Sequence, residues 1–507
     1  MARHRNGSSD FETSRPARRW LRVLLALLIA PTVLLLIFAL YLMQRFGGDE
    51  PVVYADAEEH FKYGSTGGEH ESGFPYWIFQ VMPKVCAEHL PGPGYQSVGM
   101  IFEEGKDLPV GMSMRRYQGI DRTFLNCAVC HTSTVRDTPQ SKPKLYTAMP
   151  ANTFNIMAFQ RFFFACGKDP KFSKEYVIPE VRALLKQRGE DLDLIDRYVV
   201  YPVALWLMRE RLLMLAGRFA WTDKQHDWGP GRVDTFNAAK VLFNFPLDKL
   251  PEHEQNAASD FPSIWYQGPR KGMQLHWDGN NTLVEERNKS AAFGTGTTPP
   301  TLDVAAIARI ENWLVTKEAP KYPYAIDQDK AQRGAPLYKE YCAACHGAGA
   351  RDFSGEYVGK VTPIEEIRTD RHRLDSYSLD LAVNQSTLYA GYPWRFTHFR
   401  KTFGYANMPL DGVWLRAPYL HNGSVPTLRD LLEPASKRPA IFYRGYDVYD
   451  SAKVGFVTDV AEEGGRKYFK YDVKVPGNGN AGHEGKRFGT DLSADEKEAL
   501  VEYLKTF

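Results

Sequence analysis

The sequence predicts a mainly α-helical protein, in which one N-terminal transmembrane helix precedes two helical domains with long loop insertions. Three observations support this prediction. An uncharged apolar run covers residues 23–43, the pentapeptide Cys-x-x-Cys-His occurs twice, and apolar residues recur at helical spacing on both sides of the second copy. The length of 507 residues exceeds the needs of one small domain and suggests two or three.

The first element is the apolar run at residues 23–43, which follows a tail (residues 1–22) with six arginines and two acidic residues. As a helix the run would span roughly 31 Å, enough for the hydrocarbon core of a bilayer. The positive-inside rule keeps the tail cytoplasmic and sends the rest outward. The run is longer than an ordinary signal peptide core and has no good small-residue cleavage site after it. We therefore expect an uncleaved signal anchor at 23–43 and a linker at 44–56.

The two pentapeptides carry the chemistry of the chain. Their thiols are Cys127, Cys130, Cys342 and Cys345, and their adjoining histidines are His131 and His346. Cys-x-x-Cys-His is typical of covalent haem c attachment, in which the thiols hold the haem edge and the histidine ligates the iron. The rival interpretation is a zinc or thioredoxin-like cysteine pair, which needs no adjoining histidine and lacks a βαβ pattern here. We predict two covalently bound haems c.

Composition and cysteine usage restrict the location and the partners. The net charge of +2 gives no sign of nucleic-acid binding. Outside the pentapeptides only Cys86 and Cys166 remain; they could pair in an oxidising compartment or stay as buried thiols. Because bacteria attach haem c outside the cytoplasm, we expect a single-pass protein of the bacterial inner membrane with its haem domains in the periplasm.

The first predicted domain spans residues 57–320. Its apolar spacing predicts helices within 179–187, 194–219 and 301–316. We expect the aromatic- and glycine-rich stretch before Cys127 to form loops and short helices around the first haem.

The second predicted domain spans residues 321–507 and begins where Pro320 and Pro323 break the helical pattern. One helix should lead into Cys342, and a last helix should start at a capping box made by Ser493 and Glu496. A helix before the motif that crosses a helix at the end of the domain is the plan of class I cytochromes c. The helix at 301–316 holds the equivalent place in the first half, which indicates a divergent duplication.

The segment APYLHNGSVPTL at residues 417–428 resembles the APY-x-H-x-G-x-x-x-T-L signature of bacterial di-haem cytochrome c peroxidases and the related maturation enzyme of methylamine dehydrogenase. The preceding NMPLDGVWLR, the C-terminal segment from Gly482, and FKYGS and PYWIF before the first motif are more similar to the rubber-oxygenase-like branch. The resemblance covers residues 55–507. It implies a reactive N-terminal haem and a C-terminal haem that relays electrons.

The sixth iron ligand decides what each haem can do. For the C-terminal haem the candidates are Met408, 62 residues after His346, and His483, on the loop just before the last helix. A distal ligand usually enters on that loop, and the rubber-oxygenase-like branch implies a histidine there. We prefer His483 and keep Met408 as the alternative.

For the N-terminal haem no ligand stands out from the sequence. The peroxidase pattern implies a distal histidine for acid–base work, and His276 is the best candidate catalytic residue. The rubber-oxygenase-like pattern implies instead an aromatic pocket open to O2. The candidates for its lining are Phe236, Trp228 and Trp277, and the candidate haem propionate partners are Arg368, Arg371, Arg373 and Arg416.

Two functions remain open at this point. In the first, the protein is an oxidoreductase in which peroxide or O2 reacts at the N-terminal haem and electrons arrive through the C-terminal haem. In the second, it is a non-catalytic cytochrome that passes electrons between periplasmic or membrane redox partners. Fold resemblance does not decide between them.

Overall fold

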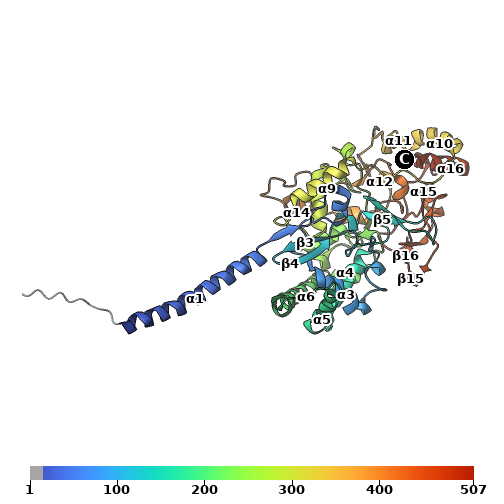
Figure 1. Cartoon of the computed structure of the whole chain (residues 1–507). Helices are drawn as coiled ribbons and strands as arrows, with labels where there is room; N and C mark the ends of the chain where they lie inside the picture. The colour runs from blue at the N-terminus through green and yellow to red at the C-terminus, as the bar shows by residue number, and fades with distance from the viewer. Residues whose placement is uncertain (1–14) are drawn as a thin grey trace, which may run out of the picture. The chain divides into compact units, whose positions relative to one another are not determined.

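The computed structural model describes residues 15–507 (Figure 1), and its helices and strands account for 44% and 12% of them. The first 14 residues of the predicted basic tail lie outside the described part. The chain forms two compact units. One runs from the first helix to Glu50 and includes Arg116–Ile120, and the other comprises Pro51–Arg115 and Asp121–Phe507.

The first unit is dominated by α1 (Arg15–Phe46), which contains the predicted apolar run. Its stretch Arg19–Phe46 is long and apolar enough to cross a membrane, with a mean hydropathy of 3.0 over its most apolar window and no residue of that window buried. Pro31 lies inside the helix, and the hydroxyl of Thr32 donates to the carbonyl of Leu28 at 2.8 Å. By length and composition, α1 is a membrane anchor or a signal peptide.

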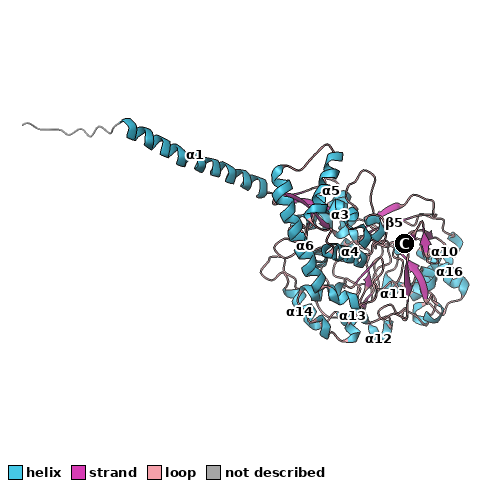
Figure 2. Ribbon diagram, turned by 90° about the horizontal axis from the view of Figure 1, so that it is seen from below, coloured by secondary structure: helices cyan, strands magenta, loops and turns pink. Residues whose placement is uncertain are grey.

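The second unit combines helices with short strand pairs, as Figure 2 shows. Its helices are α2 (Ala57–Tyr63), α3 (Tyr76–Val85), α4 (Ile156–Lys168), α5 (Lys174–Gln187), α6 (Tyr201–Arg218), α7 (Thr235–Leu242), α8 (Val284–Gly294), α9 (Val304–Thr316), α10 (Gln328–Tyr341), α11 (Ala343–His346), α12 (Ile364–Ile367), α13 (His372–Ser376), α14 (Leu379–Thr387), α15 (Leu428–Leu431) and α16 (Ala494–Leu504).

The strands are two to six residues long. They are β1 (Asp49–Pro51), β2 (Phe74–Pro75), β3 (Met112–Tyr117), β4 (Ile120–Leu125), β5 (Thr132–Val135), β6 (Lys144–Thr147), β7 (Arg232–Val233), β8 (Ser259–Asp260), β9 (Val361–Pro363), β10 (Gly404–Ala406), β11 (Ile441–Arg444), β12 (Tyr449–Asp450), β13 (Gly455–Phe456), β14 (Glu462–Glu463), β15 (Arg466–Lys467) and β16 (Phe469–Asp472). Antiparallel pairs such as β5–β6 and β9–β10 tie the loops together.

The expected helices are present. The prediction at 179–187 falls within α5, that at 194–219 covers α6, and that at 301–316 contains α9. The capping box that starts α16 is confirmed: Ser493 and Glu496 satisfy each other's backbone N–H groups. The hairpin strands β3 and β4 were not predicted.

Helices α10 and α16 lie side by side (Figure 1) and cross closely. A Cβ atom on Gly334 of α10 would lie 2.0 Å from the carbonyl oxygen of Ala499 in α16, so only glycine fits. Tyr338 of α10 is buried and packs its ring 4.7 Å from that of Phe507. In this half a helix leads into the motif and crosses the last helix.

The first half follows this plan only in part. Helix α9 packs on α2, with the rings of Trp313 and Phe61 4.9 Å apart. Residues directly before Cys127 form β4 and not a helix. Trp313 thus serves helix packing, and the predicted duplication does not extend to the approach to the motif.

A single core cluster draws on both halves of the chain. It includes Phe61 and Ile310 from before Pro320 and Trp414 and Leu500 from after it. The predicted boundary at residue 320 therefore runs through a shared core, and the division into two haem domains stays a prediction.

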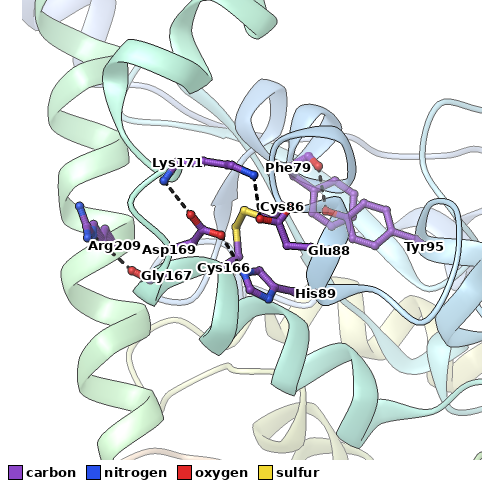
Figure 3. The surroundings of a disulfide bond; sticks show 10 residues. All are labelled: Phe79, Cys86, Glu88, His89, Tyr95, Cys166, Gly167, Asp169, Lys171 and Arg209. Carbon is purple, nitrogen blue, oxygen red and sulfur yellow. Dashed lines mark hydrogen bonds and ion pairs between the residues drawn. A yellow bond between two sulfur atoms is a disulfide. The ribbon is translucent and has the colours of Figure 1, made fainter.

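The disulfide Cys86–Cys166 joins the end of α3 to α4 (Figure 3) and closes a loop with a sequence separation of 80. The pairing left open by the sequence is therefore made. Nearby, His89 contacts Asp169 at 2.8 Å and Lys171 contacts Glu88 at 2.8 Å, so these charges pair with each other. The stacked rings of Phe79 and Tyr95, 4.4 Å apart, pack beside the link.

Replacing Cys86 and Cys166 together by alanine should lower the free energy of unfolding by about 2–5 kcal/mol, because the unfolded chain regains the entropy of an open loop. Denaturant unfolding measures the change. Peptide mapping of the unmodified protein without reductant is the control, and free thiols at both positions would contradict the pairing.

Candidate functional site

The N-terminal motif is held by Asn126, which caps the short η3 helix (Cys127–Val129). Its side-chain oxygen accepts from the N–H of Ala128 at 2.9 Å, and its amide nitrogen donates to the carbonyls of Lys62 and Gly64. Asn126 is fully buried, so these three bonds connect the motif to the end of α2 without access to water.

His131, the last residue of this motif, donates its Nδ1 proton to the carbonyl of Pro262 at 2.8 Å. The bond fixes the tautomer and leaves Nε2 as the nitrogen free to bind a metal. Loss of hydration and the nearby cation Arg287 lower the pKa of His131 to about 3, so the ring is neutral at pH 7. Burial likewise raises the pKa of the Cys127 thiol to about 11.

The C-terminal motif repeats this arrangement. His346 donates its Nδ1 proton to the carbonyl of Met408 at 2.7 Å, and desolvation lowers its pKa. The hydroxyl of Tyr338 fixes the turn after the motif by donating to the carbonyl of Gly347 at 2.7 Å. Both motif histidines therefore present Nε2 as the free nitrogen.

His483 faces His346 across the C-terminal site, with ring centroids 6.2 Å apart. Two imidazoles that ligate one metal from opposite sides have centroids about 6.2 Å apart, since each metal–nitrogen bond is about 2.0 Å long and the ring centre lies about 1.1 Å beyond it. The observed separation therefore suits a metal ion between the two rings. Desolvation, then His346 and Arg438, lower the pKa of His483 to about 3, so the ring is neutral and competent as a ligand.

The backbone around His483 is tightly fixed. Its φ of 47° is in the left-handed region, which costs energy for a non-glycine residue. Its N–H donates to the carbonyl of Ile367 at 2.8 Å, and its carbonyl accepts from Arg438 at 3.2 Å. A Cβ atom on Gly482 would lie 2.3 Å from the backbone of Arg368. This loop holds the ring in place at a conformational cost.

Met408 contributes its main chain to the opposite side of His346. Its carbonyl accepts the Nδ1 proton, and Nδ1 points away from the nitrogen that would bind a metal. The backbone of Met408 thus lies behind the proximal ring. The structure thus brings the rings of His346 and His483 close together and shows Met408 in contact with His346 through its carbonyl, and the choice of His483 as the sixth ligand stays a prediction.

A small cavity of about 50 Å³ lies next to the backbone segments that hold the two motif histidines. Its lining includes Pro262 and Met408, whose carbonyls hold the two motif histidines, together with His276 and Arg287.

His276 borders this cavity with its ring held by Asn280, whose side-chain oxygen lies 2.6 Å from Nδ1. Its φ of 63° is also left-handed. Desolvation and Arg287 lower its pKa to about 3, so at pH 7 it is a neutral hydrogen-bond acceptor at Nε2 and not a charged donor. Its ring contact is with Phe399, 6.3 Å away.

Two arginines border the cavity in different electrostatic states. Arg270 pairs with Asp411 at 2.5 Å, and Asp411 also binds Arg416 at 2.7 Å. Arg287 is without a carboxylate partner among the described residues; its one side-chain bond is to the amide oxygen of Asn288, at 3.3 Å. Burial and the neighbouring Arg270 lower the pKa of Arg287 to about 10, so it stays charged at pH 7. An unpaired cation beside a cavity favours an anionic group within it.

The aromatic residues expected at an open haem face lie elsewhere. Phe236 packs on Tyr377, Trp228 packs on Met157, and Trp277 packs against the cluster of Ile364. None of the three is among the cavity-lining residues. They belong to separate small cores, which is the packing role that sequence periodicity cannot distinguish from a pocket.

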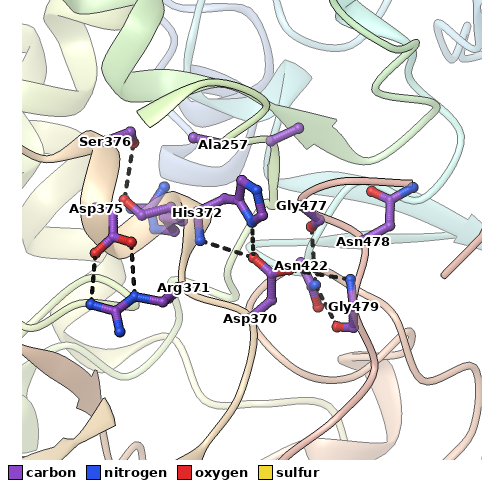
Figure 4. Close-up of polar contacts among 12 residues, drawn as sticks. Ala257, Asp370, Arg371, His372, Asp375, Ser376, Asn422, Gly477, Asn478 and Gly479 are labelled. Atoms are coloured by element: carbon purple, nitrogen blue, oxygen red, sulfur yellow. Dashed lines mark hydrogen bonds and ion pairs between the residues drawn. The ribbon is translucent and has the colours of Figure 1, made fainter. Parts of the chain in front are cut away.

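The arginines proposed as propionate partners are mostly paired within the protein. Arg371 binds Asp375 at 2.8 Å (Figure 4), Arg373 binds Asp278 at 3.3 Å, and Arg416 binds Asp411. Sequence reasoning missed Arg287. This arginine on α8 is notable only in the folded protein, where residues 15–507 provide no carboxylate to pair with it.

His421, in the APYLHNG segment, is a second residue given no role by the sequence. It is buried, its Nε2 lies 3.0 Å from the hydroxyl of Tyr405, and the two rings stack 4.1 Å apart. The adjacent Asn422 donates to the carbonyls of Gly477 and Gly479 (Figure 4). The segment therefore ties the loop before His483 to the core, which is a structural role.

Comparison with known proteins gives one family match and two relatives. A family model described as RoxA-like, cytochrome c-like matches residues 404–443, the segment with Met408 and APYLHNG. This match indicates a c-type cytochrome that binds haem c, related to the rubber-oxygenase-like group; it does not extend to the peroxidases.

Two uncharacterized proteins of Sinorhizobium fredii are similar to this chain. One, y4iM, is 34% identical over 288 residues, which cover 49% of this chain and 64% of the relative. The other, y4iJ, is 30% identical over 369 residues, which cover 56% of this chain and 61% of the relative. The chain thus spans less than two thirds of the length of either relative.

The Asn126 bonds predict a graded effect on stability. Asn126→Ala removes the cap and both donated bonds, and should lower the free energy of unfolding by about 2–3 kcal/mol. Asn126→Ser keeps an oxygen that can cap η3 and should lose less. Denaturant unfolding followed by tryptophan fluorescence measures both, and equal losses for the two variants would contradict a capping role.

Proposed function

We propose that this protein is a membrane-anchored, periplasmic di-haem c-type cytochrome that acts as an oxidoreductase, with the N-terminal site as the reactive one. When bound, haem would supply one-electron transfer and, where its iron keeps an open position, reduction of peroxide or O2. Cys127, Cys130 and His131 would hold one haem, and Cys342, Cys345 and His346 would hold the other. Electrons would come from a periplasmic redox partner or a small donor.

The observation that carries the proposal is the difference between the two sites. His346 has His483 opposite it at 6.2 Å, whereas the aromatic neighbour of His131 within the described chain is Phe261, a side chain that cannot ligate a metal. A site with two histidine ligands suits electron transfer, and a site with one suits exchange of a small ligand. His483 is therefore our sixth ligand in preference to Met408.

The cavity residues support the same assignment of roles. The guanidinium of Arg287 would offset a negative charge, from a haem propionate or from an anionic oxidant, at the N-terminal site. His276 would accept a proton at Nε2, since Asn280 occupies Nδ1. These two are the candidate reactive side chains of the site.

The proposed location rests on α1 and on the disulfide. An apolar helix follows the arginine-rich tail, and a structural disulfide belongs to an oxidising compartment such as the periplasm.

Haem content tests the cofactor assignment. The double variants Cys127→Ala/Cys130→Ala and Cys342→Ala/Cys345→Ala should each lose one of two covalently bound haems, because each removes both thioether links of one site. Intact-protein mass and pyridine haemochrome absorbance per chain measure this. An unchanged haem content in either variant, or zinc found in its place by elemental analysis, would overturn the assignment.

Low-temperature electron paramagnetic resonance tests the division of roles. The oxidised protein should give a low-spin signal from the C-terminal haem. A high-spin ferric signal from the N-terminal haem should be present at once or appear when the C-terminal haem is reduced, and it should change on adding peroxide. His483→Ala should convert the low-spin signal to high spin, whereas Met408→Leu, the matched control, should not. Two low-spin signals unchanged by reduction or peroxide would favour the non-catalytic electron carrier.

A further inference from the structure

Helix α6 carries large apolar side chains on its outward side as well as on its buried side. Its inner face packs on α4 and α5 through buried residues such as Leu205, Met208 and Leu212. A helix of this kind is normally buried all round, because an outward apolar face gains nothing from water. The outer face of α6 therefore needs a covering.

The outer face carries large apolar side chains at helical spacing. The exposed fractions are 59% for Trp206, 55% for Leu207 and 52% for Met214. The same face and the turn before it also expose Leu194, Tyr198, Val199, Val203 and Leu213.

From Val199 to Met214 this stripe extends for about 23 Å along the helix. Its one charged residue is Glu210. We call the stripe the α6 face. A continuous apolar surface of this length is a hallmark of a membrane or protein contact and not of scattered surface leucines.

The short link to α1 keeps the whole folded unit close to the membrane in which α1 would be anchored. The candidate span ends at Phe46, and the folded unit begins at Pro51, so four residues separate the two. A short covalent tether keeps the unit near the membrane surface and makes a second, weak contact effectively intramolecular. An amphipathic surface then gains enough from shallow insertion to stay docked.

Composition favours lipid over a second protein chain. Trp206 and Tyr198 belong to the residue types that are enriched at the membrane–water interface. Arg197 and Arg209 border the α6 face, and basic residues are also typical of the polar side of helices that lie in this interface. Glu210 lies in the middle of the stripe, where a protein interface would have to neutralise it on burial. At a membrane surface the Glu210 carboxylate needs no such partner, because an insertion of only about 5–10 Å leaves it in the hydrated headgroup layer.

We propose that the α6 face docks on the surface of the membrane that holds α1, which fixes the orientation of the folded unit on the lipid. The proposal rests on the anchoring role of α1 in the proposed function. The ligand is a phospholipid surface, with the apolar side chains in the upper acyl region and the flanking arginines at the phosphates.

The test uses the full-length haem-loaded protein in nanodiscs of phosphatidylethanolamine and phosphatidylglycerol. Leu207→Cys is labelled with an environment-sensitive fluorophore, which reacts there because the other six cysteines are haem-linked or paired. The matched control is Ile441→Cys in β11, an apolar residue 51% exposed. Leu36→Cys in α1 reports the anchor itself.

Lipids brominated on their acyl chains should quench the label at 207 several-fold more than the label at 441, and adding Trp206→Ser should reduce that quenching. Equal quenching at 207 and 441, together with strong quenching at 36, would contradict docking of the α6 face but would still support α1 as a membrane anchor. Absence of quenching at 36 would overturn the anchor and the docking together. If the quenching at 207 disappears when the protein is diluted, and two chains can be crosslinked through position 207, the face binds a second copy of this chain and the lipid-docking proposal is wrong. The haem absorbance spectrum of each variant confirms folding.

Discussion

The structure depends on the hydrogen bond from the Nδ1 of each motif histidine to a carbonyl far along the chain. His131 binds the carbonyl of Pro262, 131 residues away, and His346 binds that of Met408, 62 residues away. An imidazole has two nitrogens, and a carbonyl that takes the Nδ1 proton decides which one remains free. The long segments between each motif and its carbonyl, which include α4 to α7 and α12 to α14, therefore have to fold correctly before either histidine is oriented.

Those loops also hold each other. Trp265, three residues after Pro262, donates its indole N–H to the carbonyl of Asp411, three residues after Met408, at 3.1 Å. The carboxylate of Asp411 binds Arg270 and Arg416. Because the two carbonyl-bearing loops are joined in this way, both border the same cavity, and residues from both halves of the chain contribute to one hydrophobic core.

Electrostatics then distinguish the two sites. Desolvation keeps His131, His276 and His483 neutral at pH 7, which suits metal binding and proton acceptance. The cavity near the N-terminal motif carries an arginine without a carboxylate, while the C-terminal site carries a second histidine. The proposed division of roles is based on this contrast between a buried cation at one site and a second histidine at the other.

The sequence by itself determined the local features: the apolar helix, the two motifs, the capping box of α16 and the helices at α5, α6 and α9. Each depends on neighbours within a few residues, so spacing alone predicts it. It could not place His276 and Arg287 at one cavity, or separate Trp228 and Phe236 from it, because these contacts join segments far apart in the chain. The sequence likewise offered both His483 and Met408 as neighbours of His346. The loop of His483 is directed toward His346 by hydrogen bonds that its backbone makes with Arg438 and Ile367, which are distant in the sequence.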